Sequence, residues 1–391
     1  MRLLVNTLSI GSMSGQHVLF GHLSQLARWT LRQHEFLILH HAAHTCLVRE
    51  ALPFANVSFL QAPQIANHWA TRSAWESVTI PSLIRRHAVD RYFTPAGTIL
   101  PRCPVPQISL AQNPWCLVPQ IHRSFSERAK ASLQRGAYRS AATNADLMVY
   151  NSHHIRSLYS KNADNARLTS SVIAFQGIND ETHMLAKQQR NKVPRSPLSV
   201  VSVSAMAHWK GAETVVSAIG MLRERGIEAN LTLVGPWPDA MYEKSVRSSI
   251  AEKKLQNAVT ITGKVSVSEL HNHYATAKVF CLMSRCESFG IPAVEAQAFG
   301  TPVVGSSSTA MAEIGGDGGV FGPPENAATT ADMLQSVLTD NTTWSKLSAA
   351  AITNSSKYRW ETCSVPLMSI FGPGLSADKT LATNTTIGSP A

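Results

Sequence analysis

Short apolar segments alternate with segments of helical periodicity along most of this 391-residue chain. The C-terminal half shows the alternation most clearly. Its predicted strands are LSVVSVS (198–204), ANLTLVG (229–235), NAVTITG (257–263), KVFCLMS (278–284) and TPVVGSS (301–307). Helices are predicted between them over 211–226, 267–277 and 291–300. Strands of this kind, ending in small residues and joined by helices, are typical of a parallel, doubly wound sheet.

The N-terminal half repeats the pattern less regularly, with predicted helices over 15–32 and 122–142. Its predicted strands are RLLVNTL (2–8), EFLILHH (35–41), YFTPA (92–96), QISLAQN (107–113) and DLMVYNS (146–152). The chain is therefore predicted to be an α/β protein with two Rossmann-like, doubly wound domains. Such domains bind ligands at the carboxyl ends of their strands, in the cleft between them.

The domain boundaries follow from changes in composition. Residues 1–185 are predicted to form the first domain, and 198–358 the second. The polar, basic, proline-bearing segment 186–197 is predicted to link them. Residues 359–372 are predicted as a C-terminal helix that crosses back to the first domain. Residues 373–391 are small and polar, and a disordered tail is expected there.

Composition excludes several classes of protein. With 44% hydrophobic and 15% charged residues the chain is of the soluble globular type, and no apolar run is long enough to span a membrane. The start, MRLLVNTLSIGSMSG, reads as a first strand and a Gly/Ser loop rather than a signal peptide. The six cysteines lack zinc spacing, so reduced thiols in a cytoplasmic protein are expected.

The net charge of +10 lies mainly in the first half. Residues 1–185 hold 17 Lys/Arg against 9 Asp/Glu, a net of +8, which leaves +2 for the remainder. The positive charges are scattered, with no block or aromatic motif for nucleic acid, so no nucleic-acid partner is predicted. The positive charge of the first half fits a peripheral position at the anionic inner face of the plasma membrane better than it fits nucleic-acid binding. The basic helix near Arg123–Arg139 is either a solvated face or a docking face for lipid or a polyprenyl phosphate.

One loop contains the residues that best indicate a ligand. In SRCESFGIPAVEAQAFG (284–300) a strand runs into a helix near Ile291, with Glu287 before the helix and Glu295 within it. A proline in the first turn suits a helix start, whose free N–H groups and dipole attract a phosphate. Carboxylates would repel a phosphate but accept hydrogen bonds from sugar hydroxyls. The loop therefore predicts a ligand that carries both phosphate and sugar.

Inside ESFGIPAVEAQAFGTPVV, the pair of glutamates resembles the E-x7-E motif of the retaining family-four glycosyltransferases, which use nucleotide-sugars and have the GT-B fold. Two Rossmann-like domains face each other across a cleft in that fold. Weaker resemblance extends over roughly residues 1–372. The segments that carry it are VSVSAMAHWKGAETVVSAI, ADLMVYNSHHIRSLY, VIAFQGIND and SMSGQHV.

The resemblance implies two catalytic residues, Glu287 and Lys210. Glu287 would hold hydroxyls of the transferred sugar and help to stabilise positive charge at its anomeric carbon. Lys210, in HWKG, would neutralise the diphosphate as it leaves, an interaction that strengthens in the transition state. Glu295 would bind the ribose hydroxyls of the donor.

The remaining donor contacts are also implied by the resemblance. Gly15 would let the first-domain loop close over the donor, and the backbone around Lys264 and Val265 would meet the base. The residues expected to grip the diphosphate and sugar are Ser288, Phe289, Gly290 and Ile291. The sequence has no Asp-x-Asp metal site and the family needs none, so no cofactor and no metal are predicted.

The chain departs from the family pattern at one position. An arginine usually precedes the lysine by five residues, and here that place is taken by Ala205 in Ser204-Ala205-Met206. Either another basic residue substitutes, with nearby His208 as a candidate, or the leaving group is less well stabilised. Asn113, in an Asn-Pro-Trp segment at a strand end, is a candidate for acceptor or sugar contact, with a plain turn as the alternative.

The predicted function is retaining transfer of a sugar from a UDP- or GDP-sugar to a glycan or a polyprenyl- or lipid-linked acceptor. A GT-B sugar-nucleotide epimerase or phosphorylase is one alternative. A non-catalytic sugar-nucleotide binder is another, because Ala205 stands in the usual place of the arginine. Acceptor identity and the donor sugar are not determined by these motifs.

Overall fold

Consecutive apolar residues in the predicted strands fit a sheet covered on both faces, and the computed structural model has this arrangement. Val200 and Val201 are neighbours in β8 (Ser199–Val203), yet their side chains belong to two different core clusters. Successive side chains of a strand point to opposite faces, so a strand between two helical layers is apolar at every position. The residues that the structure describes are 1–11, 13–164, 166–190 and 192–372.

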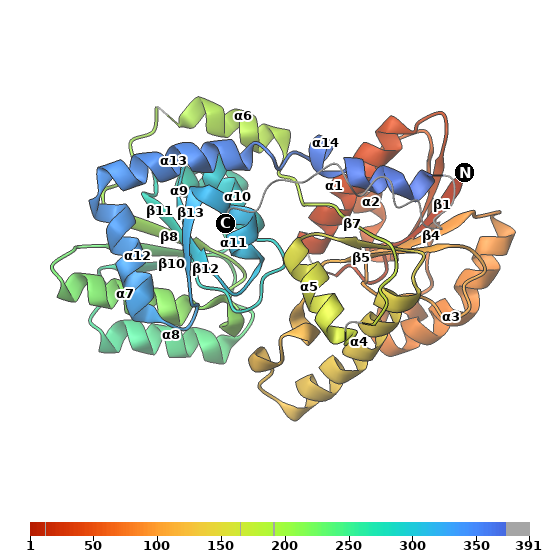
Figure 1. Cartoon of the computed structure of the whole chain (residues 1–391), viewed down its shortest axis with the longest axis horizontal. Coiled ribbons are helices and arrows are strands. Elements are labelled where there is room, and N and C mark those ends of the chain that lie inside the picture. The colour runs from red at the N-terminus through yellow and green to blue at the C-terminus, as the bar shows by residue number, and fades with distance from the viewer. Residues whose placement is uncertain (12, 165, 191, 373–391) are drawn as a thin grey trace.

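Two parallel sheets form the centres of two domains (Figure 1). The first sheet has the strand order β3-β2-β1-β4-β5-β6-β7, and the second has the order β10-β9-β8-β11-β12-β13. The strands of the first sheet are β1 (Arg2–Asn6), β2 (Glu35–His40), β3 (Val57–Gln61), β4 (Arg91–Thr94), β5 (Gln107–Ala111), β6 (Leu147–Tyr150) and β7 (Ser171–Ile173). Those of the second, after β8, are β9 (Asn230–Val234), β10 (Val259–Gly263), β11 (Val279–Leu282), β12 (Val303–Ser306) and β13 (Gly319–Gly322).

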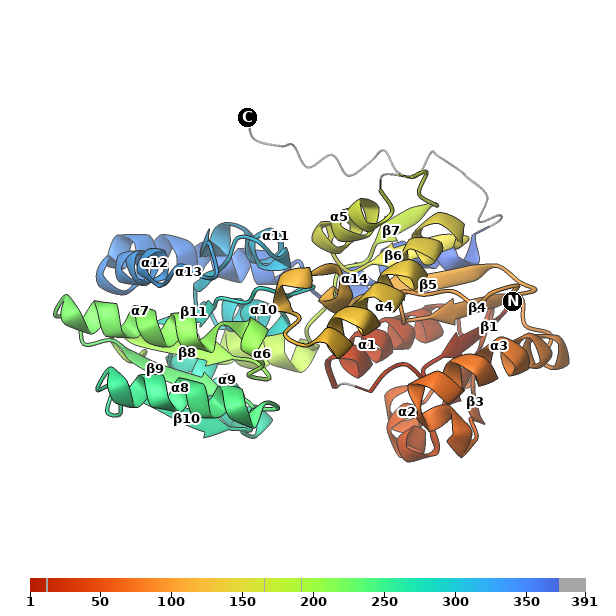
Figure 2. The ribbon, with the colours of Figure 1, turned by 90° about the horizontal axis from the view of Figure 1, so that it is seen from below.

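Helices lie on both faces of each sheet (Figures 1 and 2). The first domain contains α1 (Met13–Trp29), α2 (Thr45–Ala51), α3 (Trp69–Arg86), α4 (Phe125–Asn144) and α5 (His153–Asn162). The helix α6 (Asp180–Gln189) follows β7. The second domain contains α7 (Ala212–Glu224), α8 (Ala240–Glu252), α9 (Val267–Thr276), α10 (Ile291–Ala298), α11 (Ala310–Gly315), α12 (Ala327–Thr339) and α13 (Asn341–Ser355).

The predicted fold class is confirmed, but several elements were missed. The strand β3 and the helices α3, α8, α12 and α13 have no counterpart among the predicted segments. The helix α3 contains Pro81, and a proline normally ends a helix because it removes a backbone hydrogen bond. The strand β3 is only half-buried, so its apolar pattern is weak.

The segment predicted as a linker, 186–197, is in part helical and is fastened to the second domain. The helix α6 extends to Gln189, and Arg190 Nε donates to the carbonyl oxygen of Ala298 at 2.6 Å. Arg195 donates to the carbonyl oxygens of Ala277 and Phe299, both at 2.5 Å. Burial lowers the pKa of Arg195 to about 10. The arginines of this segment, which was predicted to be a linker, therefore donate hydrogen bonds to carbonyl oxygens of the second domain.

The chain returns to the first domain after α13. A short helix α14 (Trp360–Cys363) and the 3-10 segment Val365–Phe371 pack on α1, and the 3-10 segment also contacts β7. The Trp360 ring stacks edge-on against His17 and His22 of α1, with ring centroids 5.1 and 5.0 Å apart. A single helix was predicted over 359–372, and the structure has two short ones instead. The predicted tail over 373–391 lies outside the described residues.

No helix in the described part of the chain is both long and apolar enough to cross a bilayer.

Trp360 should be a main stabilising contact between the C-terminal segment and the first domain. Its side chain is 8% exposed, and a Cβ at Gly21 would lie 2.4 Å from its ring. We expect Trp360→Ala to lower the free energy of unfolding of the first domain by about 3–5 kcal/mol, because it leaves a large cavity. Urea-induced unfolding measures this. The control is Phe125→Ala, whose ring is 87% exposed, and an equal effect of both changes would contradict the assignment.

Candidate active site

Two loops that follow neighbouring strands meet at the carboxyl edge of the second sheet. The strand β8 pairs with β11 in parallel, so the residues after them lie side by side. The loop after β8 brings Lys210, and the loop after β11 brings Glu287. Lys210 Nζ lies 2.5 Å from Glu287 Oε2, with the two side chains 18% and 15% exposed. The two residues predicted to be catalytic are thus in direct contact.

The start of α10 has the geometry that a phosphate site needs. Gly290 caps the helix with φ of +99°, a backbone conformation that residues with a side chain rarely adopt, and Pro292 sits in the first turn. Phe289 is 1% exposed, and its ring packs edge-on against Tyr358 with centroids 5.4 Å apart. The Phe289 side chain is therefore part of the core, and only its backbone is available to a ligand.

Glu295 lies one helical turn into α10. Tyr274 Oη of α9 donates a hydrogen bond to Glu295 Oε2 at 3.0 Å. Burial raises the pKa of Glu295 to about 7, although the Tyr274 hydrogen bond acts in the opposite direction. Lys264 is exposed in the loop after β10, whereas Val265 is half-buried and packs on the core. Glu295 is therefore a carboxyl group poised between its two protonation states near neutral pH.

A cavity of about 1040 Å³, called here the cleft cavity, lies between the two domains. It brings together five of the residues predicted from the sequence. These are Gly15, Asn113, Lys210, Glu287 and Ser288. The other predicted donor residues are not among those that line it. They are Glu295, Phe289, Gly290, Ile291, Lys264 and Val265.

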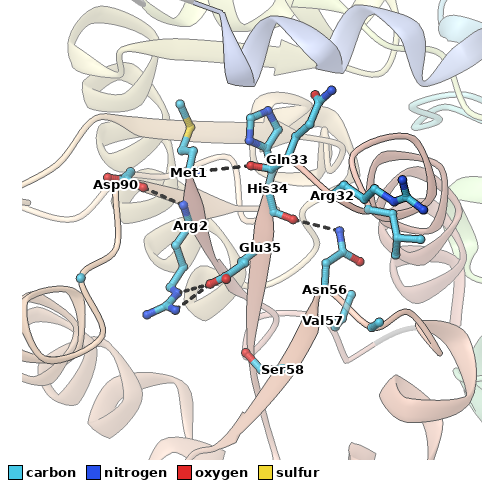
Figure 3. Close-up of a pocket in the computed structure, with 13 residues that line it drawn as sticks. Met1, Arg2, Arg32, Gln33, His34, Glu35, Asn56, Val57, Ser58 and Asp90 are labelled. Atoms are coloured by element: carbon cyan, nitrogen blue, oxygen red, sulfur yellow. Dashed lines mark hydrogen bonds and ion pairs between the residues drawn. The ribbon is translucent and has the colours of Figure 1, made fainter.

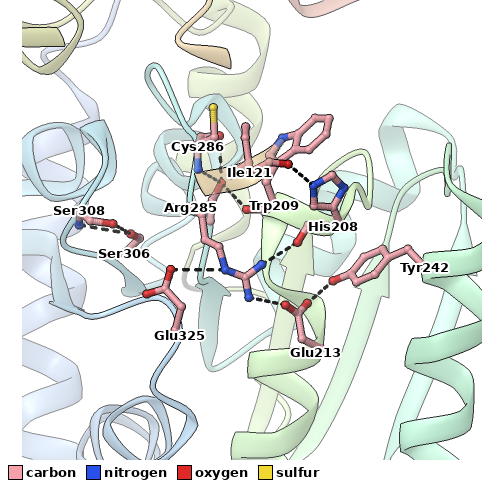
Figure 4. Close-up of polar contacts among 11 residues, drawn as sticks. Ile121, His208, Trp209, Glu213, Tyr242, Arg285, Cys286, Ser306, Ser308 and Glu325 are labelled. Carbon is pink, nitrogen blue, oxygen red and sulfur yellow. Dashed lines mark hydrogen bonds and ion pairs between the residues drawn. The ribbon is translucent and has the colours of Figure 1, made fainter. Parts of the chain in front are cut away.

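His208 does not fit the role predicted for it. Its side chain is buried, and Nε2 lies 2.8 Å from the carbonyl oxygen of Ile121 in the first domain (Figure 4). The ring also packs edge-on against Trp209, with centroids 4.9 Å apart. The imidazole is thus used in a contact between the domains, and it does not line the cleft cavity. Neither a substitute cation on the diphosphate nor an acceptor contact suits this position.

Arg285 is a site residue that the sequence analysis missed. Its backbone N–H donates to the Trp209 carbonyl oxygen at 2.7 Å, and its Nη1 donates to the His208 carbonyl oxygen at 2.7 Å (Figure 4). The guanidinium also pairs with Glu213, and its Nε lies 3.4 Å from Glu325 Oε1. Arg285 therefore fastens the loop that carries Lys210 to the loop that carries Glu287. An arginine two residues before the first glutamate was the only signal in the sequence.

The first domain contacts the same loops. Ser152 Oγ donates to the carbonyl oxygen of Ser288 at 2.9 Å. The carboxylate of Glu313 accepts hydrogen bonds from the backbone N–H groups of His153 and His154, both at 2.8 Å. A carboxylate from the second domain thus caps the N-terminus of α5, a position that the helix dipole favours. These contacts bring the first domain against the segment that carries Ser288.

A second cavity, of about 710 Å³, is remote from these loops (Figure 3). It lies at the start of β1 and β2, where Arg2 Nε donates to Glu35 Oε2 at 2.8 Å and Asn56 Nδ2 donates to the His34 carbonyl oxygen at 2.9 Å. Ligands of doubly wound sheets bind at the opposite, carboxyl edge of the strands. This cavity is therefore not a candidate for the donor site.

No three His, Cys, Asp or Glu side chains of the described residues lie together as metal ligands. That no metal is required stays a prediction.

Comparison with known proteins agrees with the fold. Residues 184–357 match the family described as "Glycosyl transferases group 1". The D-inositol 3-phosphate glycosyltransferase of Corynebacterium diphtheriae is 24% identical over 272 residues, which are 67% of this chain and 64% of that protein. The chain thus matches a little under two thirds of the length of this relative.

Two solved structures are similar over almost the whole chain. Anabaena Alr3699/HepE, solved in complex with UDP-glucose, is 16% identical with a TM-score of 0.67, covering 95% of this chain and 99% of that one. Sucrose-phosphate synthase from Thermosynechococcus elongatus is 17% identical with a TM-score of 0.72, covering 95% and 98%.

The two facing parallel-sheet domains have the GT-B fold of these glycosyltransferase structures. Within that fold, the match to the family described as "Glycosyl transferases group 1" covers the second domain and most of α6. The predicted fold is confirmed, and the match over residues 184–357 supports the predicted transferase class. The roles of the two glutamates, retention of configuration and the acceptor stay predictions.

Glu295 should make stability depend on pH. The folded protein keeps a proton on Glu295 up to a pKa of about 7, whereas the unfolded chain releases it near 4.5, so stability falls as the pH rises through this interval. We expect Glu295→Gln to remove this fall in folding stability at high pH. The variant protein should be more stable than wild type at pH 8 by on the order of 2 kcal/mol. Thermal unfolding at pH 5 and pH 8 measures the difference. Glu252→Gln, on the exposed side of α8, is the control, and a Glu295→Gln effect that is equal at both pH values would contradict the assignment.

Proposed function

We propose that the chain is a retaining glycosyltransferase that moves a sugar from a nucleotide-diphosphate sugar to a glycan or lipid-linked acceptor. The observation that carries the proposal is the Lys210–Glu287 ion pair on the wall of the cleft cavity, beside the N-terminus of α10. The pair joins a cation suited to a diphosphate and a carboxylate suited to sugar hydroxyls. The glycosyl transferases group 1 domain supports the same reaction class.

Donor binding would rearrange the ion pair. The diphosphate would lie at the start of α10, where the backbone N–H groups of Gly290 and Ile291 donate to no acceptor among the residues that the structure describes. Its charge would compete with Glu287 for Lys210, and Glu287 would then accept hydrogen bonds from the transferred sugar. Glu295 would bind the ribose hydroxyls. The base would lie against the loop of Lys264 and Val265.

Transfer would depend on charge that develops as the glycosidic bond breaks. Negative charge grows on the leaving diphosphate, and Lys210 with the positive end of the α10 dipole stabilises it. Positive charge grows at the anomeric carbon, beside the Glu287 carboxylate. In front-face attack the leaving phosphate takes the proton of the acceptor hydroxyl, so no enzymic base is needed. The configuration at the anomeric carbon is then retained.

Lys210 would be the main side-chain cation on the diphosphate. The family arginine is replaced by Ala205, and His208 is held in the contact with Ile121. The Arg285 guanidinium pairs with Glu213 and Glu325, so it is not free to take the missing role. The absence of the arginine also favours, as a second candidate, a non-catalytic sugar-nucleotide binder. Binding of nucleotide-sugars without turnover across a broad acceptor panel would distinguish it.

The donor is proposed to be a UDP- or GDP-sugar, and the structurally similar Alr3699/HepE was solved with UDP-glucose. A peripheral cytoplasmic location at a membrane surface is proposed as well. The basic helix α4 supports it, because Phe125 and Leu133 are 87% and 72% exposed on the same helix as Arg128 and Arg139. Exposed apolar side chains on a helix that also carries arginines suit an anionic bilayer surface.

Removal of the Glu287 carboxylate should separate binding from transfer. We expect Glu287→Gln to lower the transfer rate by about 100-fold or more, because a charge that stabilises the transition state is lost. Donor-dependent thermal stabilisation should persist, since Lys210 and the start of α10 remain. Transfer is measured by release of nucleoside diphosphate with a panel of UDP- and GDP-sugars and acceptors.

The matched control for this experiment is Glu224→Gln, at the exposed end of α7. Wild-type rates in Glu287→Gln would overturn the proposed function.

A further inference from the structure

A chain of polar side chains connects the segments that follow three strands of the second sheet, β8, β9 and β11 (Figure 4). Its middle member, Glu213, lies in the first turn of α7. Tyr242 Oη of α8 donates to Glu213 Oε2, and Arg285 Nη2 donates to Glu213 Oε1. The two oxygens of one carboxylate thus hold two side chains from different segments. These three residues are called here the Glu213 bridge.

Tyr242 is the fixed end of the bridge. It is 5% exposed, and its ring lies against that of Trp237 with centroids 5.7 Å apart. Its backbone N–H donates at 3.0 Å to the side chain of Asp239, which caps α8. Burial, together with the neighbouring Glu213 carboxylate, raises the pKa of Tyr242 well above its usual value. The hydroxyl therefore stays protonated at neutral pH and donates to Glu213.

Arg285 is the end of the bridge that meets the loop of Lys210. Its Nη1 donates to the His208 carbonyl oxygen, and its backbone N–H donates to the Trp209 carbonyl oxygen, both at 2.7 Å. These carbonyls belong to the two residues directly before Lys210. The direction of the guanidinium therefore affects the backbone that carries the lysine.

Glu213 is the stronger of the two carboxylate partners of Arg285. The other partner, Glu325, has a side chain that is 64% exposed, and its Oε1 lies 3.4 Å from Arg285 Nε. An exposed carboxylate at this distance holds its partner weakly. Glu213 is closer and less exposed, and Tyr242 fixes it from the other side. The position of the guanidinium is therefore set mainly by Glu213.

Lys210 depends on this backbone for its position. Its Nζ contacts Glu287 Oε2 at 2.5 Å, and in the proposed complex the diphosphate takes over that contact. A lysine side chain is flexible, so the place of its ammonium group then depends on where the backbone is held. Gly211, the next residue, has φ of +71°, and a Cβ there would lie 2.1 Å from the Met283 carbonyl oxygen. The loop of Lys210 thus packs directly against the chain that leads to Arg285.

We propose that Tyr242 and Glu213 are positioning residues that hold Lys210 at the leaving diphosphate, acting through Arg285 and the carbonyl oxygens of the Lys210 loop. Neither Tyr242 nor Glu213 is among the residues that line the cleft cavity. A change at either residue therefore acts through the geometry of Lys210 and not through a lost contact with the donor. The inference rests on the proposed function, because it takes Lys210 to stabilise negative charge that grows on the diphosphate.

Loss of the bridge should lower kcat more than it changes the KM of the donor. We expect Tyr242→Phe to lower kcat about 3- to 10-fold, the contribution of one hydrogen bond. Glu213→Gln should lower kcat about tenfold or more, because the ion pair with Arg285 is lost as well. The KM of the donor should change by less than about twofold, since the contacts at the start of α10 remain. Release of nucleoside diphosphate measures both constants.

Each variant has a matched control. Tyr159→Phe removes another buried hydroxyl, which donates to the Gly97 carbonyl oxygen at 3.4 Å in the first domain. Glu224→Gln changes a glutamate at the exposed end of α7, the helix that carries Glu213. Both controls should keep the wild-type kcat. A wild-type kcat in either bridge variant, or an equal loss in its control, would overturn the inference.

A double-mutant cycle with Lys210 separates positioning from a general structural effect. In the wild-type background, Lys210→Gln should lower kcat about 100-fold. In the Glu213→Gln background it should lower kcat only about tenfold, because a displaced Lys210 has already lost part of its effect. In the Glu224→Gln background the full 100-fold loss should return. Effects of Lys210→Gln and Glu213→Gln that simply multiply would show that Glu213 does not act through Lys210.

Binding of UDP and GDP gives a readout that does not need turnover, because a free nucleoside diphosphate carries the charge that the leaving group acquires. Calorimetric titration measures the Kd of the nucleotide that binds. We expect Lys210→Gln to weaken binding about tenfold in the wild-type background and about twofold in the Glu213→Gln background. An equal loss in both backgrounds would contradict the positioning role of Glu213.

The two measurements distinguish failure of the inference from failure of the proposed function. If the wild-type protein binds UDP or GDP but consumes no nucleotide-sugar with any acceptor, the proposed function fails, and the binding cycle alone decides whether Glu213 positions Lys210. If neither nucleotide binds, the proposed function and the inference fail together. If transfer occurs and the bridge variants match wild type, only the inference fails.

Discussion

The ion pair between Lys210 and Glu287 is the contact on which the proposed donor site depends. A charge pair this far removed from water costs desolvation energy, and that cost is recovered only if the geometry is held closely. Three features hold it. Parallel pairing of β8 with β11 sets the two loops side by side, Arg285 bonds one loop to the other, and Gly290 turns the chain into α10 just after Glu287. In the proposed complex a diphosphate takes the place of Glu287 on Lys210, and sugar hydroxyls donate hydrogen bonds to the Glu287 carboxylate.

The contacts between the domains converge on the same place. Ser152 donates to the Ser288 carbonyl oxygen, directly after Glu287, and the Glu313 carboxylate caps α5 of the first domain. His208, two residues before Lys210, contacts the carbonyl oxygen of Ile121 in the first domain through its Nε2 atom. Each contact involves a loop that carries a proposed donor residue or a helix beside it. Domain arrangement and donor-site geometry are therefore coupled through short backbone segments.

Much of this architecture could be predicted from local pattern. Runs such as LSVVSVS have one physical explanation, burial on both faces of a parallel sheet, and the loop ESFGIPAVE carries its turn, its helix start and its two acids in nine residues. The side-chain partners could not be predicted in this way. Whether His208 faces a ligand or Ile121 depends on how two domains meet, and Arg285 acquires its role only through Glu213 and Glu325, which are distant in sequence. The helix α3 was missed because Pro81 interrupts its helical pattern in the sequence.

A crystal structure with a bound nucleoside diphosphate would test the central claim most directly. The account predicts the diphosphate at the N-terminus of α10, within hydrogen-bond distance of Lys210 Nζ and of the backbone N–H groups of Gly290 and Ile291. It also predicts Glu295 at the ribose hydroxyls and a Lys210–Glu287 distance longer than the present 2.5 Å. A nucleotide bound elsewhere, or one bound in the cleft with the ion pair unchanged, would contradict the account.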